Sequence, residues 1–490
     1  MYYIGIDLGT SSVKLLLMAQ DGEIVNEVTR DYELSLPKPL WSEQNPVDWY
    51  TESIEGLKEL LTSVDREQVA SIGFSGQMHG LVLLDENDQV IRPAILWNDQ
   101  RSDRETAYLN EDLGVEKLTA YTGNIAYPGF TAPKLLWVKA NEPEHFAKIQ
   151  KVMLPKDYLA YRLSGVFATD YADASGTLYL DVASRRWSQE MLDIIGITES
   201  QVPKLYESFE CIGTLKPELA AETGLSSATK IIIGGGDQAC AAVGGGVVSS
   251  GVCSISLGTS GVVFIHGDQF SKDPNNGLHA FCHSNGAYHL MGCMLSAAGS
   301  LKWWVEEALK SKAYDDLLER AKQAPIDNGL YFLPYLMGER SPHNDADARG
   351  VFWGINLTHD QGDMTRAVLE GVSFGLRDSF EIFAKLDQPV SEIRINGGGA
   401  QNEFWCQMIA DILNTRVVKL KTDAGPAYGA AILSAVGSGA YRDVASACEA
   451  IVKTSVSYEP IEQNVAAYDA KYSKFSLLYP NVKSLYKLMK

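Results

Sequence analysis

Two aspartates, Asp7 and Asp237, each stand at the end of a short run of apolar residues and glycine. Phosphoryl transfer needs a carboxylate that orients or deprotonates the attacking hydroxyl, and a metal ion that neutralises the phosphate charge. Beside Asp7, Leu8-Gly-Thr-Ser11 forms a loop that is repeated as Leu257-Gly-Thr-Ser260. Glycine-rich strand ends expose backbone N–H groups that suit phosphate oxygens, and threonine or serine hydroxyls add donors. The pattern therefore indicates phosphoryl-transfer chemistry.

The two copies of the loop differ at one position, where Ser256 stands in place of Asp7. The acid is not needed to form the loop, so its presence in one copy favours a functional role through Mg²⁺. The alternatives are a plain tight turn for each loop and a solvated turn aspartate for Asp7. Two copies of the loop, together with glycine triplets at 234–236 and 397–399, favour a shared nucleotide cradle.

Other common nucleotide and hydrolase motifs are absent from the sequence. It contains no Gly-x-x-x-x-Gly-Lys-Ser/Thr, which excludes a P-loop protein, and no Gly-x-Gly-x-x-Gly opening a helix, which leaves a dinucleotide fold unsupported. Gly73-Phe-Ser-Gly76 has the wrong spacing for a nucleophile elbow. His79 lies between glycines at a predicted strand end, where a substrate could approach it.

A second group of residues has side chains that can bind zinc. It consists of His279, Cys282, His283 and His289. Ordinary strand residues are the favoured interpretation, because a strand is predicted over 288–291 and the preceding segment alternates poorly.

Hydrophobic patterns and turn residues predict the elements that position these groups. Strands are expected at 3–7, 13–19, 24–28 and 69–74, with a helix at 47–61 that begins after Asn45-Pro46. The strand–loop–strand pattern recurs at 253–265, and a single repeat of such long period indicates two similar halves, not a solenoid. The runs 231–237 and 393–400, each closed by three glycines, are interpreted as a second trace of this duplication.

The composition limits the partners and the compartment. The formal net charge of −20 argues against non-specific nucleic-acid binding, which needs a basic surface. No apolar stretch reaches the roughly 20 residues of a membrane span. The start, Met1-Tyr-Tyr-Ile-Gly-Ile-Asp7, does not read as a signal peptide. The seven scattered cysteines, without Cys-x-x-Cys, favour reduced thiols in a cytoplasmic protein.

The motifs, taken in order, resemble those of the FGGY family of carbohydrate kinases over nearly the whole chain. In the first half they are Ile4-Gly-Ile-Asp-Leu-Gly-Thr10, Leu40-Trp-Ser-Glu-Gln44, Gly76-Gln-Met-His-Gly80, Pro93-Ala-Ile-Leu-Trp-Asn-Asp99, Pro128-Gly-Phe-Thr-Ala-Pro-Lys-Leu-Leu-Trp137, Leu154-Pro-Lys-Asp-Tyr158 and Gly234-Gly-Gly-Asp237. In the second half they are Leu257-Gly-Thr-Ser260, Gly338-Glu-Arg-Ser-Pro342, Gly350-Val-Phe-Trp-Gly354 and Asn396-Gly-Gly-Gly399. Several are weak singly, but their order and spacing are specific to the family.

The resemblance implies an α/β fold of two ribonuclease-H-like lobes, as in actin-like ATPases, with a nucleotide cleft between them. We expect residues 1–243 to form an N-terminal lobe that binds the sugar and carries the catalytic base. Residues 244–457 are expected to form a nucleotide-binding C-terminal lobe, and residues 458–490 a helical tail.

The resemblance also implies roles for single residues. Asp237 matches the general base that takes the proton from the attacking sugar hydroxyl, and Asp7 matches the acid that works with Mg²⁺. Met78 and His79 match a pair that contacts the sugar. The nucleotide-binding positions are matched by Thr10, Thr259, Gly299, Gly398 and Asn402.

One position departs from the family members that this chain resembles most. Gln238 follows the base where asparagine is expected, and glutamine there is familiar from glycerol kinases. Both amides can bond a sugar hydroxyl, but the longer side chain shifts the pocket by about one methylene. Glycerol kinases usually place Arg-Glu at the position of Met78-His79, which argues against glycerol.

The resemblance therefore implies ATP-dependent phosphorylation of the 5-hydroxyl of D-xylulose, with ATP and Mg²⁺ as cofactors. One alternative is a related kinase for another ketopentose, a pentitol or glycerol. A remote alternative is an actin-like or chaperone-type ATPase, which would have no use for Met78 and His79. The expected partners are the sugar and ATP, without nucleic acid or membrane, and a homodimer stays open.

Overall fold

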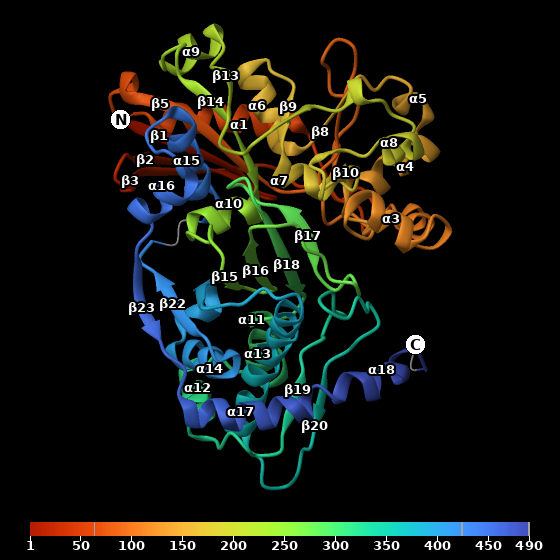
Figure 1. Ribbon diagram of the computed structural model, residues 1–490, viewed down its shortest axis with the longest axis vertical. Coiled ribbons are helices and arrows are strands. Elements are labelled where there is room, and N and C mark those ends of the chain that lie inside the picture. Colours follow the sequence, from red (N-terminus) through yellow and green to blue (C-terminus); the bar gives the residue numbers. More distant parts are fainter. Residues whose placement is uncertain (63, 423–424, 489–490) are drawn as a thin grey trace.

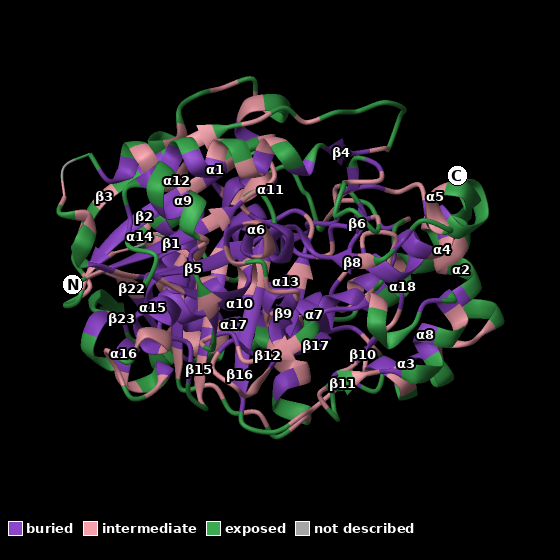
Figure 2. Cartoon of the chain, turned by 90° about the horizontal axis from the view of Figure 1, so that it is seen from above, coloured by how far each residue is buried: buried purple, intermediate pink, exposed green. Residues whose placement is uncertain are grey.

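The computed structural model describes residues 1–62, 64–422 and 425–488. Two mixed β-sheets with helices around them form two lobes, one above the other in Figure 1. The lobes confirm the expected α/β, actin-like architecture. Figure 2 shows buried residues concentrated in the middle of the molecule and exposed residues on outer helices such as α8 (Gln189–Ile195).

The first sheet has six strands in the order β13-β14-β5-β1-β2-β3. Their bounds are β1 Tyr2–Leu8, β2 Ser12–Ala19, β3 Ile24–Asp31, β5 Val69–Gly76, β13 Cys211–Thr214 and β14 Lys230–Gly236. The predicted strands at the N-terminus are confirmed. The β1–β5–β14 group is parallel and buried, which fits its continuous runs of isoleucine and glycine.

The second sheet has seven strands in the order β17-β18-β16-β15-β21-β22-β23. Their bounds are β15 Val252–Leu257, β16 Gly261–Gly267, β17 His279–Cys282, β18 Tyr288–Met294, β21 Glu392–Asn396, β22 Arg416–Leu420 and β23 Thr454–Tyr458. Strands β15 and β16 form the same antiparallel pair around the loop Leu-Gly-Thr-Ser as β1 and β2 do. The predicted duplication is confirmed in these two strand pairs.

The second predicted trace of the duplication is wrong. Strand β21, which precedes the triplet 397–399, lies directly beside β15, as β5 lies beside β1. Strand β14, which carries the triplet 234–236, is one place further out and corresponds to β22. The two glycine triplets therefore belong to non-equivalent strands. Glycine occurs wherever the backbone comes close to another group, so similar triplets need not mark repeated positions.

Helix α15 (Gly425–Ser438) comes late in the chain but packs against the first sheet, where its blue ribbon lies beside the red strands in Figure 1. Glycines in the strands allow this close contact. A Cβ atom on Gly5 of β1 would lie 1.9 Å from the carbonyl oxygen of Ala427, and one on Gly73 of β5 would lie 2.5 Å from that of Ala430. Helix α16 (Val444–Ile451) continues the layer.

Helices α10 (Asp237–Gly244) and α15 follow the corresponding strands β14 and β22, and they pack against each other between the lobes. A Cβ atom on Gly429 would lie 1.8 Å from the carbonyl oxygen of Cys240, and one on Gly244 would lie 3.1 Å from the nitrogen of Gly429. The contact between the lobes therefore depends on glycine in both helices.

The remaining elements complete the two lobes. The other helices are α1 Pro46–Leu60, α2 Asp103–Ala107, α3 Val115–Thr122, α4 Thr131–Asn141, α5 Pro143–Phe146, α6 Pro155–Ser164, α7 Tyr171–Ala174, α9 Pro217–Thr223, α11 Ala298–Lys302, α12 Tyr314–Gln323, α13 Gln361–Lys385, α14 Glu403–Leu413, α17 Glu462–Phe475 and α18 Leu478–Leu488. The short strands are β4 Glu43–Gln44, β6 Val82–Leu84, β7 Ala94–Ile95, β8 Lys151–Met153, β9 Ala168–Asp170, β10 Leu180–Asp181, β11 Arg186–Trp187, β12 Lys204–Tyr206, β19 Tyr331–Leu333 and β20 Val351–Trp353. Among the described residues, none of these helices combines the length and apolar character that crossing a membrane requires.

Two local predictions can be compared with these bounds. Helix α1 confirms the predicted helix, and the Asn45 side chain accepts a hydrogen bond from the nitrogen of Val47 as its cap. After Tyr458 the described part of the chain forms α17 and α18, as the tail was expected to do.

Candidate active site

Asp7 lies at the carboxyl end of β1, beside Lys14 of β2 and Ser75 of β5 in the sheet register. Burial raises the pKa of its carboxyl group to about 6, although the neighbouring Ser75 hydroxyl and the charge of Lys14 lower it. Its Oδ1 atom is buried without a hydrogen-bond partner among the described residues. An unpartnered carboxylate oxygen at a strand end fits a hard cation such as Mg²⁺, which prefers oxygen ligands.

Asp237 opens α10, directly after the glycine triplet that ends β14. Burial and the negative charge of Asp7 raise the pKa of Asp237 to about 7, and hydrogen bonds from Gln238 act in the opposite direction. Both Asp237 and Gln238 keep part of their surface exposed. A reachable carboxylate with a pKa near neutrality can take a proton from a hydroxyl group.

The order of the strands brings these acids together. Strands β1, β5 and β14 are neighbours and run parallel, so their carboxyl ends meet at one edge of the first sheet. Asp7 is the last residue but one of β1, the segment 77–80 follows β5, and Asp237 follows β14. The carboxyl edge of a parallel sheet is where ligands bind in many α/β proteins.

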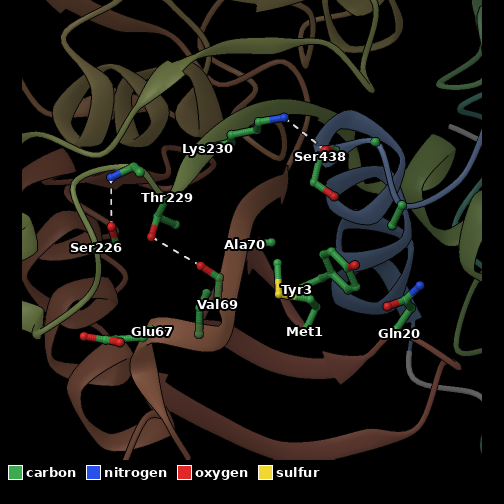
Figure 3. A pocket seen from close by; sticks show the side chains of 13 residues that line it. Met1, Tyr3, Gln20, Glu67, Val69, Ala70, Ser226, Thr229, Lys230 and Ser438 are labelled. Carbon is green, nitrogen blue, oxygen red and sulfur yellow. Dashed lines mark hydrogen bonds between the residues drawn. The ribbon is translucent and has the colours of Figure 1, made fainter.

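The opposite end of the first sheet, where β1, β5 and β14 begin, holds a separate cavity of about 480 Å³, shown in Figure 3. The starts of β1, β5 and β14 line it through Tyr3, Val69 and Lys230, and Ser438 closes one side. Lys230 Nζ donates a hydrogen bond to the carbonyl oxygen of Ser438 at 3.0 Å. Since strands of this length span about 20 Å, the cavity is remote from Asp7 and Asp237.

Met78 lies next to Asp237, and His79 lies against Gly176. A Cβ atom on Gly236, the residue before Asp237, would lie 3.0 Å from the Sδ atom of Met78. A Cβ atom on Gly176 would lie 2.3 Å from the imidazole of His79. The structure therefore brings Met78 to Asp237, and glycines at two positions make room for the Met78 and His79 side chains.

The protonation state of His79 follows from its surroundings. Burial lowers its pKa to about 3, and the nearby Lys134 adds to the effect, so the imidazole is neutral at pH 7. Its Nδ1 atom is 2.8 Å from the carbonyl oxygen of Gly176. A carbonyl oxygen only accepts, so Nδ1 carries the proton and Nε2 is left as an acceptor for a hydroxyl group.

Lys134 holds the backbone of His79 in place. His79 has a φ of +69°, which is uncommon for a residue with a Cβ atom. Lys134 Nζ donates to the carbonyl oxygens of His79 at 2.9 Å and of Gly129 at 2.7 Å, and Thr131 Oγ1 donates to His79 as well. Burial lowers the pKa of Lys134 well below its usual value. Sequence reasoning did not select this lysine.

A buried ionic cluster supports the other side of the site. In this Lys156 cluster, Lys156 Nζ lies 2.6 Å from Asp157 and 2.8 Å from Asp170, and Asp173 lies 3.6 Å away. Asp170 also contacts the end of β14, because a Cβ atom on Gly235 would lie 3.4 Å from its Oδ2 atom. Lys156 and Asp157 belong to the family motif at 154–158, so the sequence marked these residues. The motif did not indicate that they lie beside the site.

The second lobe contains a cavity of about 560 Å³ beside the repeated loop. Four of the five residues predicted to bind the nucleotide line it, namely Thr259, Gly299, Gly398 and Asn402. A Cβ atom on Gly398 would meet nothing within 4 Å, so this glycine faces open space. The volume lies within the range of sites for molecules the size of a nucleotide.

Thr10 and Asn402 also have structural partners. Thr10 lies outside this cavity, in the loop of the first lobe, where its Oγ1 atom accepts from Trp97 Nε1 at 2.9 Å. The Asn402 side chain caps α14 by accepting from the nitrogen of Trp405 at 2.8 Å. Its position at the cavity wall is therefore set by the start of the helix.

The histidine and cysteine group lies in and beside two strands of the second sheet. His279 and Cys282 belong to β17 and His289 to β18, which confirms the interpretation as strand residues. His283 Nε2 lies 2.8 Å from the carbonyl oxygen of Val247. Across the ranges described, no three histidine, cysteine or acidic side chains are arranged to hold a metal ion.

Comparison with known proteins places the chain among carbohydrate kinases. The N-terminal domain of the FGGY family of carbohydrate kinases matches residues 2–244, and its C-terminal domain matches residues 253–438. Together the two matches cover most of the chain.

Individual relatives match over nearly their full length. The xylulose kinase of Bacillus subtilis (strain 168) is 42% identical, with 99% of this chain and 98% of that protein covered. The xylulose kinase of Escherichia coli (strain K12) is also 42% identical, with 97% and 98% covered. A crystal structure of a "xyloylose kinase" from Brucella ovis superimposes with a TM-score of 0.94 at 40% identity, with 99% and 100% covered. This chain belongs to the FGGY family of carbohydrate kinases.

Proposed function

We propose that the protein transfers the γ-phosphoryl group of ATP to the 5-hydroxyl of D-xylulose. The observation that carries the proposal is Asp237, a reachable carboxylate whose pKa is raised to about 7 and which lies next to Met78 and the Asp7 carboxylate. Relatives that match over almost the whole chain and are named xylulose kinases support the choice of sugar.

In this mechanism Asp237 accepts the proton of the 5-hydroxyl as that oxygen attacks the γ-phosphorus, while the bond from this phosphorus to the bridging oxygen breaks and ADP leaves. The pKa of Asp237 near neutrality suits this task, because a base works best when its pKa lies close to the operating pH. The Gln238 amide, which lies close enough to Asp237 to lower its pKa, also orients a sugar hydroxyl. His79 Nε2 accepts from a second sugar hydroxyl, and Met78 packs against the carbon chain.

Asp7 would hold Mg²⁺ through its unpartnered Oδ1 atom, directly or through water. When bound there, the ion would neutralise charge on the phosphate oxygens. Thr10 and Thr259, one from each copy of the loop, would donate to these oxygens from opposite lobes. Gly299, Gly398 and Asn402 would hold the rest of the nucleotide in the cavity of the second lobe. Closing the lobes would exclude water from the transfer.

We propose the same division of the chain as the sequence predicts, with sugar and base in 1–243, nucleotide in 244–457 and a helical tail in 458–490. The packing of α15 and α16 on the first sheet adds one feature, because these late helices support the lobe that carries the base.

A coupled ATPase assay with a panel of sugars tests the function. D-xylulose should give the highest kcat/KM, above other ketopentoses, pentitols and glycerol. Gln238 makes glycerol the most informative competitor. A clear preference for glycerol, or ATP hydrolysis that no sugar stimulates, would contradict the proposal.

A further inference from the structure

Arg340 belongs to the motif 338–342, which has no part in the function proposed above. The motif is fixed to β18 of the second lobe. Ser341 N donates to the carbonyl oxygen of Cys293 at 2.9 Å, and Cys293 N donates to Ser341 Oγ at 2.9 Å. Ser341, the residue directly after Arg340, is therefore held by two hydrogen bonds, which limits the positions that the Arg340 side chain can reach.

Across the interface between the lobes, Arg340 meets an aromatic residue of the first lobe. Its guanidinium carbon lies 5.0 Å from the ring centroid of Tyr127, within the range of a cation–π contact. The Tyr127 hydroxyl donates to Asn344 Oδ1 at 2.7 Å, so a second residue near the motif bridges the lobes at the same place.

Tyr127 is part of a wall that leads to the sugar contact His79. Its ring centroid lies 5.4 Å from that of Phe130, which in turn lies 4.5 Å from that of His79. His279 of the second lobe lies 5.2 Å from Tyr127. Burial is the main cause of the lowered pKa of His79 and His279, and the charge of Arg340 adds to it in both. Arg340 is thus close to the His79 end of the site.

Many arginines with little exposure pair with an acid. Six whose side chains are less than 20% exposed form ion pairs with carboxylates: Arg92, Arg101, Arg185, Arg366, Arg377 and Arg394. Arg340 forms none with any residue that the structure describes, and it keeps part of its surface exposed.

The neighbouring Glu339 does not neutralise this cation. Burial raises the pKa of Glu339 to about 8, so the carboxyl group holds its proton at pH 7. Its Oε1 atom accepts from the backbone of Leu295 and Arg340, and its Oε2 atom is buried without a hydrogen-bond partner in the part of the chain that the structure describes. The Arg340 guanidinium, which also lies close enough to the Cys293 thiol to lower its pKa, therefore has no charged partner among the described residues.

We propose that Arg340 is a sugar-binding residue supplied by the second lobe, and that it donates hydrogen bonds to the C1–C2 end of D-xylulose. This inference rests on the proposed function, which places the 5-hydroxyl at Asp237 and leaves the other end of the sugar toward His79. The planar guanidinium presents several donors at once, and the C2 carbonyl and C1 hydroxyl oxygens accept. The sugar would then contact both lobes, which links sugar binding to their closure.

The alternative ligand for Arg340 is the phosphoryl group that is transferred. The phosphate loops lie at the ends of β1 and β15, around Thr10 and Thr259, whereas Arg340 lies against Tyr127 and beside the Cys293 thiol of β18. The geometry therefore favours the sugar end over the phosphoryl group, and the two can be separated by experiment.

Calorimetric binding of D-xylulose, D-xylulose 5-phosphate and ADP to the wild type, Arg340→Met and Arg340→Lys tests the inference. A charge-assisted hydrogen bond corresponds to about 10- to 100-fold in affinity. Arg340→Met should weaken D-xylulose and its 5-phosphate by the same factor in this range, and leave ADP binding within about twofold. Arg340→Lys keeps the charge and should recover part of the affinity, and it serves as the test if the methionine variant does not fold.

Arg442, whose side chain is 85% exposed, provides the matched control, and Arg442→Met should bind all three ligands as the wild type does. Unchanged D-xylulose binding in both Arg340 variants would overturn the inference. Loss confined to the 5-phosphate would also overturn it and would assign Arg340 to the phosphoryl group. If the wild type binds another sugar instead of D-xylulose, the proposed function fails, and the same comparison with that sugar and its phosphate tests Arg340.

Discussion

The negative charge of Asp7 acts on Asp237 and, together with burial, raises the pKa of Asp237 to about 7. Asp7 and Asp237 come from opposite ends of the segment 1–243 in sequence. Strands β1 and β14 both pair in parallel with β5, and this pairing brings the two residues to the same end of the first sheet. Two acids so close together are expected to divide their roles, with one bound to a cation and the other accepting a proton. This division leads to the first prediction.

Replacing Asp237 by alanine should remove sugar phosphorylation and spare nucleotide binding. A general base contributes about 10²- to 10⁴-fold to the rate, and Asp237 lies outside the cavity that holds Thr259 and Gly398. Steady-state kcat and calorimetric ADP binding check the two parts. Asp193→Ala, at an exposed acid of α8, is the control. Turnover of Asp237→Ala close to that of the wild type would remove Asp237 from the role of base.

The rate should depend on pH through Asp237. The base works only when deprotonated, so kcat/KM should fall as the pH drops through the Asp237 pKa of about 7. If Mg²⁺ at Asp7 offsets the neighbouring negative charge, the pKa of Asp237 is lower and the fall occurs at lower pH. Hydrogen bonds from Gln238 lower this pKa, so Gln238→Ala should move the acid limb of the profile to higher pH. An acid limb that stays in place in Gln238→Ala would contradict the assignment.

Gly429→Ala should destabilise the protein by about 1–3 kcal/mol, as is usual for overpacking. The added Cβ would lie 1.8 Å from the carbonyl oxygen of Cys240, so α10 and α15 must move apart. The gain in helix propensity, about 0.5–1 kcal/mol, does not offset this. Urea denaturation measures the difference.

Gly398→Ala is the matched control for Gly429→Ala, because its Cβ would meet nothing within 4 Å. Its free energy of unfolding should stay unchanged, and its KM for ATP should rise, since the new methyl group occupies part of the nucleotide cavity. Equal stability of the two variants would show that the helix contact tolerates a side chain.

Buried histidines should make the protein less stable in acid. Burial, with the charges of His283 and His266, lowers the pKa of His289 well below 6.5. Below pH 6.5 the unfolded chain binds a proton that the folded state excludes, so stability falls as the pH drops. The ring of His289 stacks on Phe264 at 4.0 Å, and phenylalanine preserves this contact.

Relative to the wild type, His289→Phe should therefore gain about 1.4 kcal/mol in free energy of unfolding between pH 7.5 and pH 5.5. Urea denaturation of both proteins at the two pH values gives the difference. A difference between them that does not change with pH would mean that His289 is protonated in the folded state.

Local patterns in the sequence were sufficient to predict much of the secondary structure of the first lobe and to select the acids Asp7 and Asp237. The strand–loop–strand unit around Asp7 and the cap at Asn45 depend on neighbouring residues, and both were predicted. The cap formed by Asn402 could have been predicted in the same way, since asparagine before Glu403 and an apolar run is a typical helix start.

What could not be predicted depends on pairing between distant segments. The two glycine triplets look alike, but sheet order places β14 and β21 at non-equivalent positions. The contact of Arg340 with Tyr127 joins residues of different lobes, and nothing near either residue indicates it. Likewise, Gly5 gave no sign that Ala427 would pack on it.

The packing of α15 on the first sheet has a consequence for biosynthesis. Residues 1–243 leave the ribosome long before 425–438, and until then the faces of β1 and β5 that receive α15 have no cover. The amino-terminal half therefore cannot complete its native core during translation, and its folding must wait for the last fifth of the polypeptide. A fragment that ends near residue 243 would expose the same apolar face permanently, and it should aggregate unless the carboxy-terminal half is supplied with it.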